Sequence, residues 1–364
     1  MSPRVSVGLP VFNGERFLVQ TLGDLLEGTF EDIEVVAVDN ASTDGTADLL
    51  ADAARRDRRV RVLRNAANIG ALANANRAFA ASRAPLYALG SYDDRHAPTF
   101  VEALAEALGR APQAVLAYGA STLVGEHDRP FAFDRARRLY VDAAGETYGY
   151  DARLERPLTT GGGAAGAVAR YRAVLASNDV NAPIHGLFRR AALERIGPHR
   201  LHGSDRLVVA HAALLGPFAY VPEALFGFRI HAASTFHLTR EAWLTREAGR
   251  AAAATAAQGA LDGARTLGSY ARATGEADLG APARALALAV SAGYAVRPAV
   301  LRRVLLPGPD NSWGWTRWPG RAAPRPAHAP QLGDDLGAWK WLTDSTHAAQ
   351  ASDGTSGEAA GVRS

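Results

Sequence analysis

Apolar and polar positions change period repeatedly along residues 1–125. Short runs rich in Val, Ile and Leu, typical of buried strands, alternate with longer segments whose apolar residues recur every three or four positions, typical of amphipathic helices. The expected strands are Val5–Leu9, Ile33–Asp39, Val60–Leu63, Leu86–Gly90 and Val115–Val124, and the expected helices are Arg16–Leu26, Thr46–Arg55, Ala71–Ser82 and Pro98–Leu108. This alternation predicts a parallel sheet covered by helices. Pro98 fits a first helical turn and Gly109 the end of that helix.

The pattern is weaker beyond this region. Residues 126–165 show no clear period, and Gly161–Gly163 predicts a loop before a helix at Ala164–Ala176. The later elements expected are a strand near Ile184–Phe188, helices at Ala191–Ile196 and Asp205–Leu215, an apolar stretch at Phe218–Ile230, and Ala-rich helices from Arg250 to Leu305. The Pro-, Gly- and Trp-rich residues after Pro307 predict a loosely ordered tail.

Composition indicates an ordinary globular protein. Hydrophobic residues make up 48% and charged residues 21% of the 364 residues, and the net charge of +3 comes from scattered Lys and Arg, which argues against nucleic acid as a partner. The absence of cysteine excludes disulfides and thiolate metal sites. The start resembles no signal peptide, and the longest apolar run, Ala285–Val296, is too short to cross a bilayer. We expect a soluble cytoplasmic protein without a transmembrane segment, with peripheral membrane contact left open.

Polar residues follow several of the predicted strands. Asp93 and Asp94 come directly after the Leu86–Gly90 strand, where carboxylates can bind a divalent cation against a diphosphate. Asp39 ends the second strand and can accept a hydrogen bond from a base or a ribose hydroxyl. The alternative for Asp39 is a hydrogen bond within the turn that follows the strand. For Asp44 we expect helix capping.

The order and spacing of these tips resemble family 2 glycosyltransferases. The matching segments are Pro10–Gly14, Asp39 with Ser42–Thr46, Asn68–Gly70 with Asn76, Asp93–Asp94, Gly203–Arg206, Leu215–Gly216, Val221–Glu223 and Phe228–His231. The resemblance covers residues 3–235 and implies a GT-A fold, a Rossmann-like α/β domain with a mostly parallel sheet and helices on both faces. A C-terminal helical extension would follow.

The resemblance also implies roles for parts of the chain. Residues 1–125 would form the nucleotide-sugar-binding half, 126–240 the acceptor-side half, 241–306 the helical extension and 307–364 a partly disordered tail. The residues expected at the nucleotide sugar are Pro10, Phe12, Asn13, Asp39, Asn68, Asn76, Ser91, Tyr92, Asp93 and Arg229. Arg229 would bind the diphosphate, since its guanidinium matches phosphate oxygens.

The cation site departs from the family pattern. Ser91 stands at the first acidic position of the D-x-D motif, and Asp93 is its last carboxylate. Asp94 can supply a second carboxylate or bind protein backbone. His231 is expected to complete the site, with Mn²⁺ favoured over Mg²⁺ because imidazole is the softer ligand. The alternative for His231 is a strand-end histidine bonded to backbone.

Asp205 is the expected catalytic base. The family likeness favours this role, whereas its place at the start of a helix fits capping equally well. His185 precedes a strand and can line the acceptor side, although a lone histidine is more often structural. The tryptophans of the tail can stack on a sugar or lipid, but more often such residues pack onto the protein.

We therefore expect an inverting hexosyltransferase that uses a nucleotide sugar, with a UDP-sugar favoured, and a divalent metal, Mn²⁺ or Mg²⁺. A catalytically weak or inactive nucleotide-sugar-binding protein is the alternative, and Ser91 is its support. The acceptor can be a glycan, a lipid carrier, a natural product or a peptide. A nucleotidyltransferase or a dinucleotide-dependent dehydrogenase would need a Gly-rich phosphate loop after the first strand, which the sequence lacks.

Overall fold

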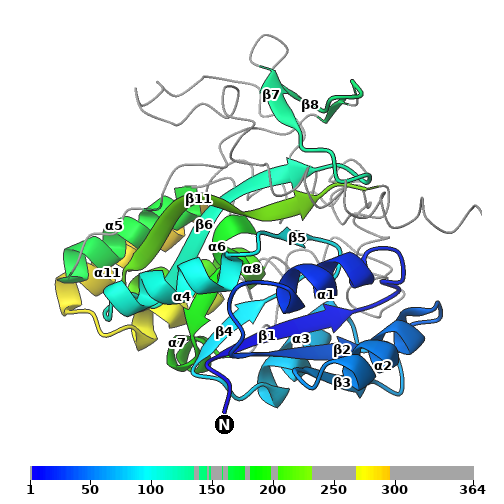
Figure 1. Ribbon diagram of the computed structural model, residues 1–364. Helices are drawn as coiled ribbons and strands as arrows, with labels where there is room; N and C mark the ends of the chain where they lie inside the picture. Colours follow the sequence, from blue (N-terminus) through cyan, green and yellow to red (C-terminus); the bar gives the residue numbers. More distant parts are fainter. Residues whose placement is uncertain are drawn as a thin grey trace, which may run out of the picture.

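An eight-stranded mixed sheet forms the centre of the protein, which is described by a computed structural model over residues 2–134, 139–145, 147–148, 158, 163–176, 181–197, 204–231 and 268–295 (Figure 1). The strand order is β3-β2-β1-β4-β10-β6-β11-β5. The strands are β1 (Val5–Val11), β2 (Ile33–Asp39), β3 (Val60–Arg64), β4 (Leu86–Leu89), β5 (Arg95–His96), β6 (Leu116–Val124), β10 (Leu187–Arg189) and β11 (Phe218–Arg229). Only β10 and β5 run antiparallel to their neighbours, which confirms a mostly parallel sheet.

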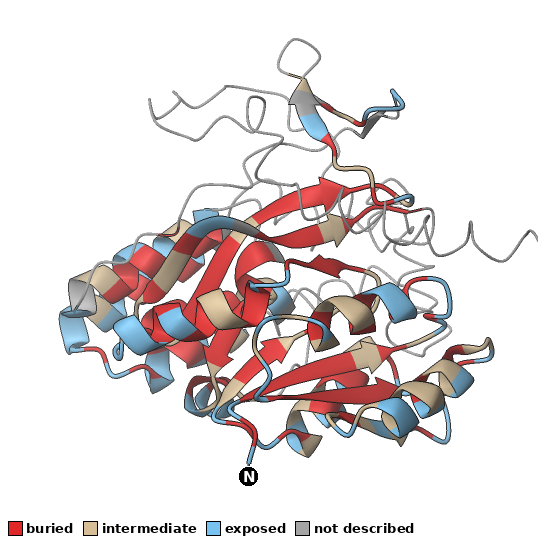
Figure 2. Cartoon of the chain, viewed as in Figure 1, coloured by how far each residue is buried: buried red, intermediate tan, exposed pale blue. Residues whose placement is uncertain are grey.

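Helices cover both faces of this sheet. The side chains of α1 (Leu18–Leu26), α2 (Thr46–Arg56) and α4 (Phe100–Arg110) pack with Val35 and Ala37 of β2, whereas α3 (Ala71–Ala81) packs with Val36 and Val38. Successive strand residues point to opposite faces, so α3 lies on the other side from α1. The strands are buried while the outer faces of the helices are exposed (Figure 2). The sequence alternation thus corresponds to a three-layer α/β arrangement.

A second core lies on the α3 side of the sheet, beyond β4. It is built by α5 (Gly163–Ala176), α6 (Asn181–Ile184), α7 (Arg190–Ile196), α8 (Ser204–Leu215) and α11 (Ala281–Ala295). The Tyr171 hydroxyl of α5 and the Ser291 hydroxyl of α11 lie 2.7 Å apart in a buried hydrogen bond. Helix α11 therefore packs on the body as part of the expected helical extension. Residues 241–267 and 296–364, with the tail tryptophans, lie outside the described residues.

Most predicted elements of the first 125 residues are confirmed to within two residues, and the helix expected at Pro98–Leu108 is displaced. It runs from Phe100 to Arg110, with Thr99 at its N-cap, so Gly109 lies inside its last turn. Pro98 precedes the helix, and its carbonyl accepts a hydrogen bond from the Thr29 N–H at 2.9 Å. That contact places Pro98 in the connection from β5 and not in the first turn.

Short elements account for the other differences. The strand expected near Ile184–Phe188 is Leu187–Arg189, and Ile184 ends the helix α6. Strand β5 was not predicted, nor was the small antiparallel sheet of β7 (Ala132–Asp134), β8 (Leu139–Val141) and β9 (Thr147–Tyr148). Strands of two or three residues are too short for alternation to be recognised. In the described part of the chain no helix has the length and apolarity needed to cross a membrane.

Candidate active site

The tips of β1 and β2 are joined by reciprocal hydrogen bonds. The register pairs Val11 with Asp39, so both strands end at the same level. The Asn13 N–H donates to the Ser42 hydroxyl at 2.9 Å, and the Asn13 side-chain oxygen accepts from the Thr43 N–H at 2.9 Å. The N–H of the next residue, Gly14, donates to Thr46 Oγ1 at 2.8 Å. We call Asn13–Gly14 with Ser42–Thr46 the tip region.

One oxygen of the Asp39 carboxylate is bonded within the turn that follows β2. Its Oδ1 accepts from the Ser42 N–H at 2.9 Å, and its Oδ2 lies 3.1 Å from Arg64 Nε in an ion pair that lacks hydrogen-bond geometry. Oδ2 therefore accepts no hydrogen bond from another described residue, and it is buried in this conformation. Asp44 precedes Gly45, the N-cap of α2, and its Oδ1 accepts from the Thr46 N–H at 3.1 Å. It therefore bonds the first N–H of the helix from the turn before it and not from the N-cap position.

The third tip is also organised by its own residues. The side-chain oxygen of Asn68 accepts from Asn40 Nδ2 and from the Gly70 N–H, both at 2.8 Å. Gly70 has a φ of 85°, a conformation suited to glycine, and leads into α3. Asn76 lies half-buried in that helix. Pro10 and Phe12, at the end of β1, are half-buried as well.

Asp93 and His231 meet beyond the end of β4. Asp93 Oδ2 and His231 Nε2 are 3.0 Å apart, and the Ser91 hydroxyl donates to Asp93 Oδ1. The His231 ring packs on Phe17, with centroids 4.8 Å apart. Burial by itself raises the pKa of Asp93, but the hydrogen bonds from His231 and Ser91 outweigh it and leave this pKa below its usual value. The carboxylate is therefore kept ionised.

This pair suits a divalent cation whose remaining ligands come from a substrate. Two ligand atoms at right angles on a metal with bonds of about 2.1 Å lie about 3 Å apart, which matches the separation of Asp93 Oδ2 and His231 Nε2. Mg²⁺ is typically bound by one or two carboxylates together with substrate phosphates. Among the described residues, no group of three or more acidic or histidine side chains forms a complete site. Ser91 contacts Asp93 and thus orients the carboxylate.

Tyr92 lies between these residues and packs on the first strand tip. A Cβ on Gly14 would come within 2.8 Å of Tyr92 Cδ2, so only glycine fits there. The carbonyl of Tyr92 accepts from the Thr21 hydroxyl of α1 at 2.9 Å. The D-x-D segment is therefore fixed against both β1 and α1.

Asp94 faces the protein interior. Its Oδ1 accepts from the Arg229 N–H at 2.8 Å, and its buried Oδ2 has no hydrogen-bond partner among the described residues. Burial, together with the negative charge of Asp93, raises the pKa of Asp94 well above its usual value. Of the two alternatives for Asp94, backbone binding is the one observed.

The expected contact of Arg229 with a diphosphate is not available in this conformation. Its side chain is 0% exposed. Its five N–H groups donate to the carbonyls of Asp93, Gly125 and Glu126 and to the side chains of Gln20 and Asp128. A guanidinium has five donors, so none is left for a phosphate. Arg229 instead positions Asp93, whose carbonyl lies 2.6 Å from its Nε.

A buried group of charges surrounds this arginine, and sequence reasoning missed it. Arg95 forms a bidentate pair with Asp24 at 2.7 and 3.0 Å, and its third nitrogen lies 2.8 Å from Asp128. Asp128 also accepts from Arg229 at 2.6 Å. We call Asp24, Arg95, Asp128 and Arg229 the ionic cluster. The available signal was the charged pair Asp94–Arg95 directly after an apolar strand.

Asp205 lies in the first turn of α8 and is exposed. No hydrogen bond joins its carboxylate to another described residue, so capping is not observed within that part of the chain. The charges of Asp205 and Asp93 both act on His185, where each raises the pKa that burial, the larger effect, lowers. The two carboxylates therefore lie within electrostatic reach of one imidazole.

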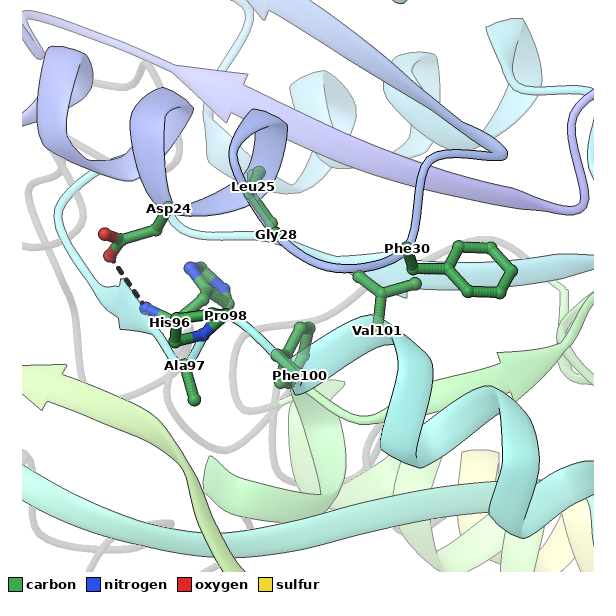
Figure 3. Close-up of a pocket in the computed structure, with 9 residues that line it drawn as sticks. All are labelled: Asp24, Leu25, Gly28, Phe30, His96, Ala97, Pro98, Phe100 and Val101. Atoms are coloured by element: carbon green, nitrogen blue, oxygen red, sulfur yellow. Dashed lines mark hydrogen bonds between the residues drawn. The ribbon is translucent and has the colours of Figure 1, made fainter. Parts of the chain in front are cut away.

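A small hollow near β5 is separate from Asp93, His231 and Asp205. It has a volume of about 10 Å³, which is room for about one water molecule and for no larger ligand. Its lining includes Asp24, Gly28, His96 and Val101 (Figure 3). Asp24 accepts from the His96 N–H at 2.9 Å. Burial, with the nearby charges of His185 and Arg95, lowers the pKa of His96 to about 3. His96 is therefore neutral and structural.

Sequence comparison finds similarity over the first 160 residues of the chain. Residues 6–160 match the model of glycosyl transferase family 2. The glycosyltransferase GlyG of Streptococcus pneumoniae is 29% identical over 104 residues, which cover 29% of this chain and 35% of that protein. EpsJ of Bacillus subtilis, named as a glycosyltransferase, is 36% identical over 66 residues, 18% of this chain and 19% of that protein. The matched stretches thus span about a third or less of these relatives.

Structural comparison agrees on the fold. The crystal structure of S. aureus TarS 1–349 superposes with a TM-score of 0.54 and 16% identity, over 81% of this chain and 72% of that one. The complex of the same protein with UDP-GlcNAc gives a TM-score of 0.51 with the same coverage. At this identity the likeness establishes fold alone. Residues 6–160 are thus similar to glycosyl transferase family 2, and the curled, mostly parallel sheet has the GT-A fold.

Proposed function

We propose that this protein is an inverting glycosyltransferase that transfers a hexosyl group from a UDP-sugar to an acceptor hydroxyl, with a divalent cation at Asp93 and His231. One observation carries the proposal. His185 lies between the segments that carry Asp93 and Asp205: its Nδ1 is 2.8 Å from the carbonyl of Leu89, which ends the strand before Asp93, and α6, directly before His185, packs on α8, whose first turn carries Asp205. Asp93 is suited to the diphosphate side because it is ionised beside His231. Asp205 is suited to the acceptor side because it is exposed and makes no hydrogen bond to another described residue.

The donor is proposed from the strand tips. Asp39 Oδ2 accepts no hydrogen bond from another described residue, and the tip region lies on the same sheet edge as Asp93. The complex of TarS with UDP-GlcNAc supports a UDP-sugar. The residues proposed to line the nucleotide sugar are Pro10, Phe12, Asn13, Asp39, Asn68, Asn76, Ser91, Tyr92 and Asp93. Residues 1–125 would then bind the donor and residues 126–240 the acceptor. The cytoplasmic location remains a prediction.

The chemical step is a single displacement. The acceptor oxygen forms a bond to the anomeric carbon while the bond from that carbon to the diphosphate oxygen breaks, which inverts the configuration. Asp205 takes the proton of the acceptor hydroxyl, and UDP leaves with the electron pair. General-base help of this kind contributes about 10²–10⁴ in rate. A bound Mn²⁺ or Mg²⁺ supplies positive charge against the charge that develops on the diphosphate.

The first test is the variant Asp205→Asn in an assay of UDP release across common UDP-sugars. Transfer should fall about 10²- to 10⁴-fold while UDP affinity stays within twofold, because only the proton acceptor is lost. Glu106→Gln is the matched control, since Glu106 is an exposed helical carboxylate that pairs with Arg110 on the surface of α4. Transfer at the wild-type rate in the Asp205 variant would show that the base is another residue.

The second test concerns the cation. Asp93→Ala should weaken UDP binding at least about tenfold with Mn²⁺ present and leave it nearly unchanged with EDTA, as expected when a metal ligand is removed. Calorimetry under both conditions measures this. Equal losses with and without metal would point to a structural role of Asp93 alone.

An inactive nucleotide-sugar-binding protein is the second candidate. Ser91 favours it, because a serine replaces a carboxylate at the first acidic position and its hydroxyl contacts Asp93. Wild-type protein that binds UDP-sugar without hydrolysing or transferring it, with any of the metals, would support this candidate over the transferase.

A further inference from the structure

His185 is held in place by contacts on three sides. It lies in the turn between α6 and β10. Its Nδ1 is 2.8 Å from the carbonyl oxygen of Leu89, the last residue of β4, and its ring stacks on Phe226 with centroids 4.9 Å apart at 18°. A Cβ on the next residue, Gly186, would come within 2.4 Å of the Ala117 carbonyl, so the backbone lies directly against β6. The orientation of the ring is therefore fixed.

These contacts decide which ring nitrogen carries the proton. A carbonyl oxygen only accepts, so Nδ1 donates to Leu89 and Nε2 keeps a lone pair. Burial lowers the pKa of His185 by more than the contact with Leu89 and the charges of Asp205 and Asp93 raise it, which keeps the ring neutral. Nε2 has no hydrogen-bond partner among the described residues. His185 thus presents an unused acceptor.

The position of the ring indicates what Nε2 would meet. Leu89 leads through three residues into the Asp93 segment, and α6, directly before His185, packs against α8, whose first turn carries Asp205. The proposed function places the diphosphate at Asp93 and the acceptor at Asp205. In a single displacement the transferred sugar lies between the leaving group and the acceptor.

We propose that His185 is a donor-sugar-binding residue whose Nε2 accepts a hydrogen bond from a hydroxyl of the transferred sugar. This inference rests on the proposed function and extends it to the choice of sugar. A sugar without a hydroxyl at the matching ring position would lose the contact, and the neutral ring would have no other partner for its lone pair.

Two substitutions separate this role from a structural one. His185→Asn keeps a donor at the position of Nδ1, near Leu89, and removes the distal acceptor. His185→Gln keeps a polar atom at the position of Nε2 and loses the contact with Leu89. The exposed His127 provides the control His127→Asn.

Calorimetry with Mn²⁺ would compare UDP with UDP-glucose, UDP-galactose and UDP-N-acetylglucosamine, using for the variants the UDP-sugar that the wild type binds most tightly. His185→Asn should lower the affinity for that UDP-sugar about three- to tenfold and the affinity for UDP less than twofold. His185→Gln and His127→Asn should keep the ratio of the two affinities within twofold of wild type.

Other outcomes overturn the inference. An unchanged ratio in His185→Asn, or a wild-type protein that binds no UDP-sugar more tightly than UDP, would leave Nε2 without a role in sugar binding. If the Asn variant does not fold, the Gln variant decides, and a tenfold lower ratio there counts against the proposal. Failure of the proposed function would look different, because wild-type protein would then not bind UDP at all.

Discussion

The tip region and the ionic cluster stabilise neighbouring parts of the same sheet edge by different means. In the tip region, neutral or singly charged groups join loops that belong to two adjacent strands, as in the bond from the Gly14 N–H to Thr46 Oγ1. In the ionic cluster, four charged side chains from α1, β5, the loop after β6 and β11 balance one another in the interior. Asp128 and Arg229 are 6% and 0% exposed.

The difference indicates how Asp93 and His231 are positioned in the site. The tip region depends on turns whose hydrogen bonds each contribute about 0.5–1.5 kcal/mol. In the ionic cluster, Arg229 fixes the backbone at Asp93 through the bond from its Nε to the Asp93 carbonyl, and Arg229 itself lies two residues before His231. Removal of one charge of the cluster leaves another buried without compensation. We therefore expect loss of a cluster member to affect both stability and metal-linked activity, and loss of a tip contact to affect mainly local order.

Asp128→Asn should have the largest effect on stability. Asp128 has a φ of 59°, which asparagine tolerates, so the substitution removes charge without straining the backbone. The substitution removes the carboxylate charge that Arg95 and Arg229 share, and we expect a loss of about 3–5 kcal/mol in the free energy of unfolding. Urea denaturation of wild type and variant would measure it.

Asp52→Asn is the control for this prediction. Asp52 pairs with Arg55 and Arg56 on the solvent side of α2, and exposed pairs contribute about 0–1 kcal/mol. Similar losses in the two variants would mean that burial does not distinguish the ionic cluster from a surface pair.

Thr46→Val should have an intermediate effect. The substitution keeps the shape of the side chain but leaves the buried Gly14 N–H without its acceptor, at a cost of about 1–3 kcal/mol. Thr43→Val is the matched control, because Thr43 is exposed and its hydroxyl lies 3.5 Å from Asn13 Oδ1. Thermal unfolding of both variants tests the prediction, and equal stability would indicate that the strand tips are joined by other contacts.

The smallest effect concerns pH. Burial raises the pKa of Asp128, but the charges of Arg229 and Arg95 outweigh it, so the pKa is lower in the folded protein than in the unfolded chain. Its contribution is therefore present above about pH 4 and declines as the pH falls through the folded pKa. The difference in the free energy of unfolding between wild type and Asp128→Asn should shrink below about pH 4. A difference that grows on acidification would contradict the lowered pKa.

Local pattern was sufficient for most of the first half of the chain. The strand Ile33–Asp39 was predicted with its observed bounds, because a continuous apolar run ends there in a turn rich in Asn, Ser and Asp. The same turn signal placed Asp44 at the start of α2, where it bonds the Thr46 N–H from the position before the N-cap. The order of polar tips also indicated a resemblance to the family whose model matches residues 6–160. Parallel strands bring their carboxyl ends to one edge, which places these tips together.

Long-range contacts could not be inferred in this way. Arg229 lies far along the chain from Gln20 and Asp128, so nothing local shows that its five donors are used within the protein. Asp94 and Asp93 are adjacent in sequence, yet one faces the interior and the other His231.

The sequence by itself determined the alternation of strands and helices, the edge on which the polar tips gather, and the resemblance of residues 6–160 to glycosyl transferase family 2. Those features follow from hydrophobic period and turn preference, which act over a few residues. Only the tertiary structure decided which charged groups are neutralised inside and which face outward, because burial and pairing depend on segments that meet through folding. The free acceptor of His185 is of this second kind, since its orientation comes from Leu89, Phe226 and Gly186 together.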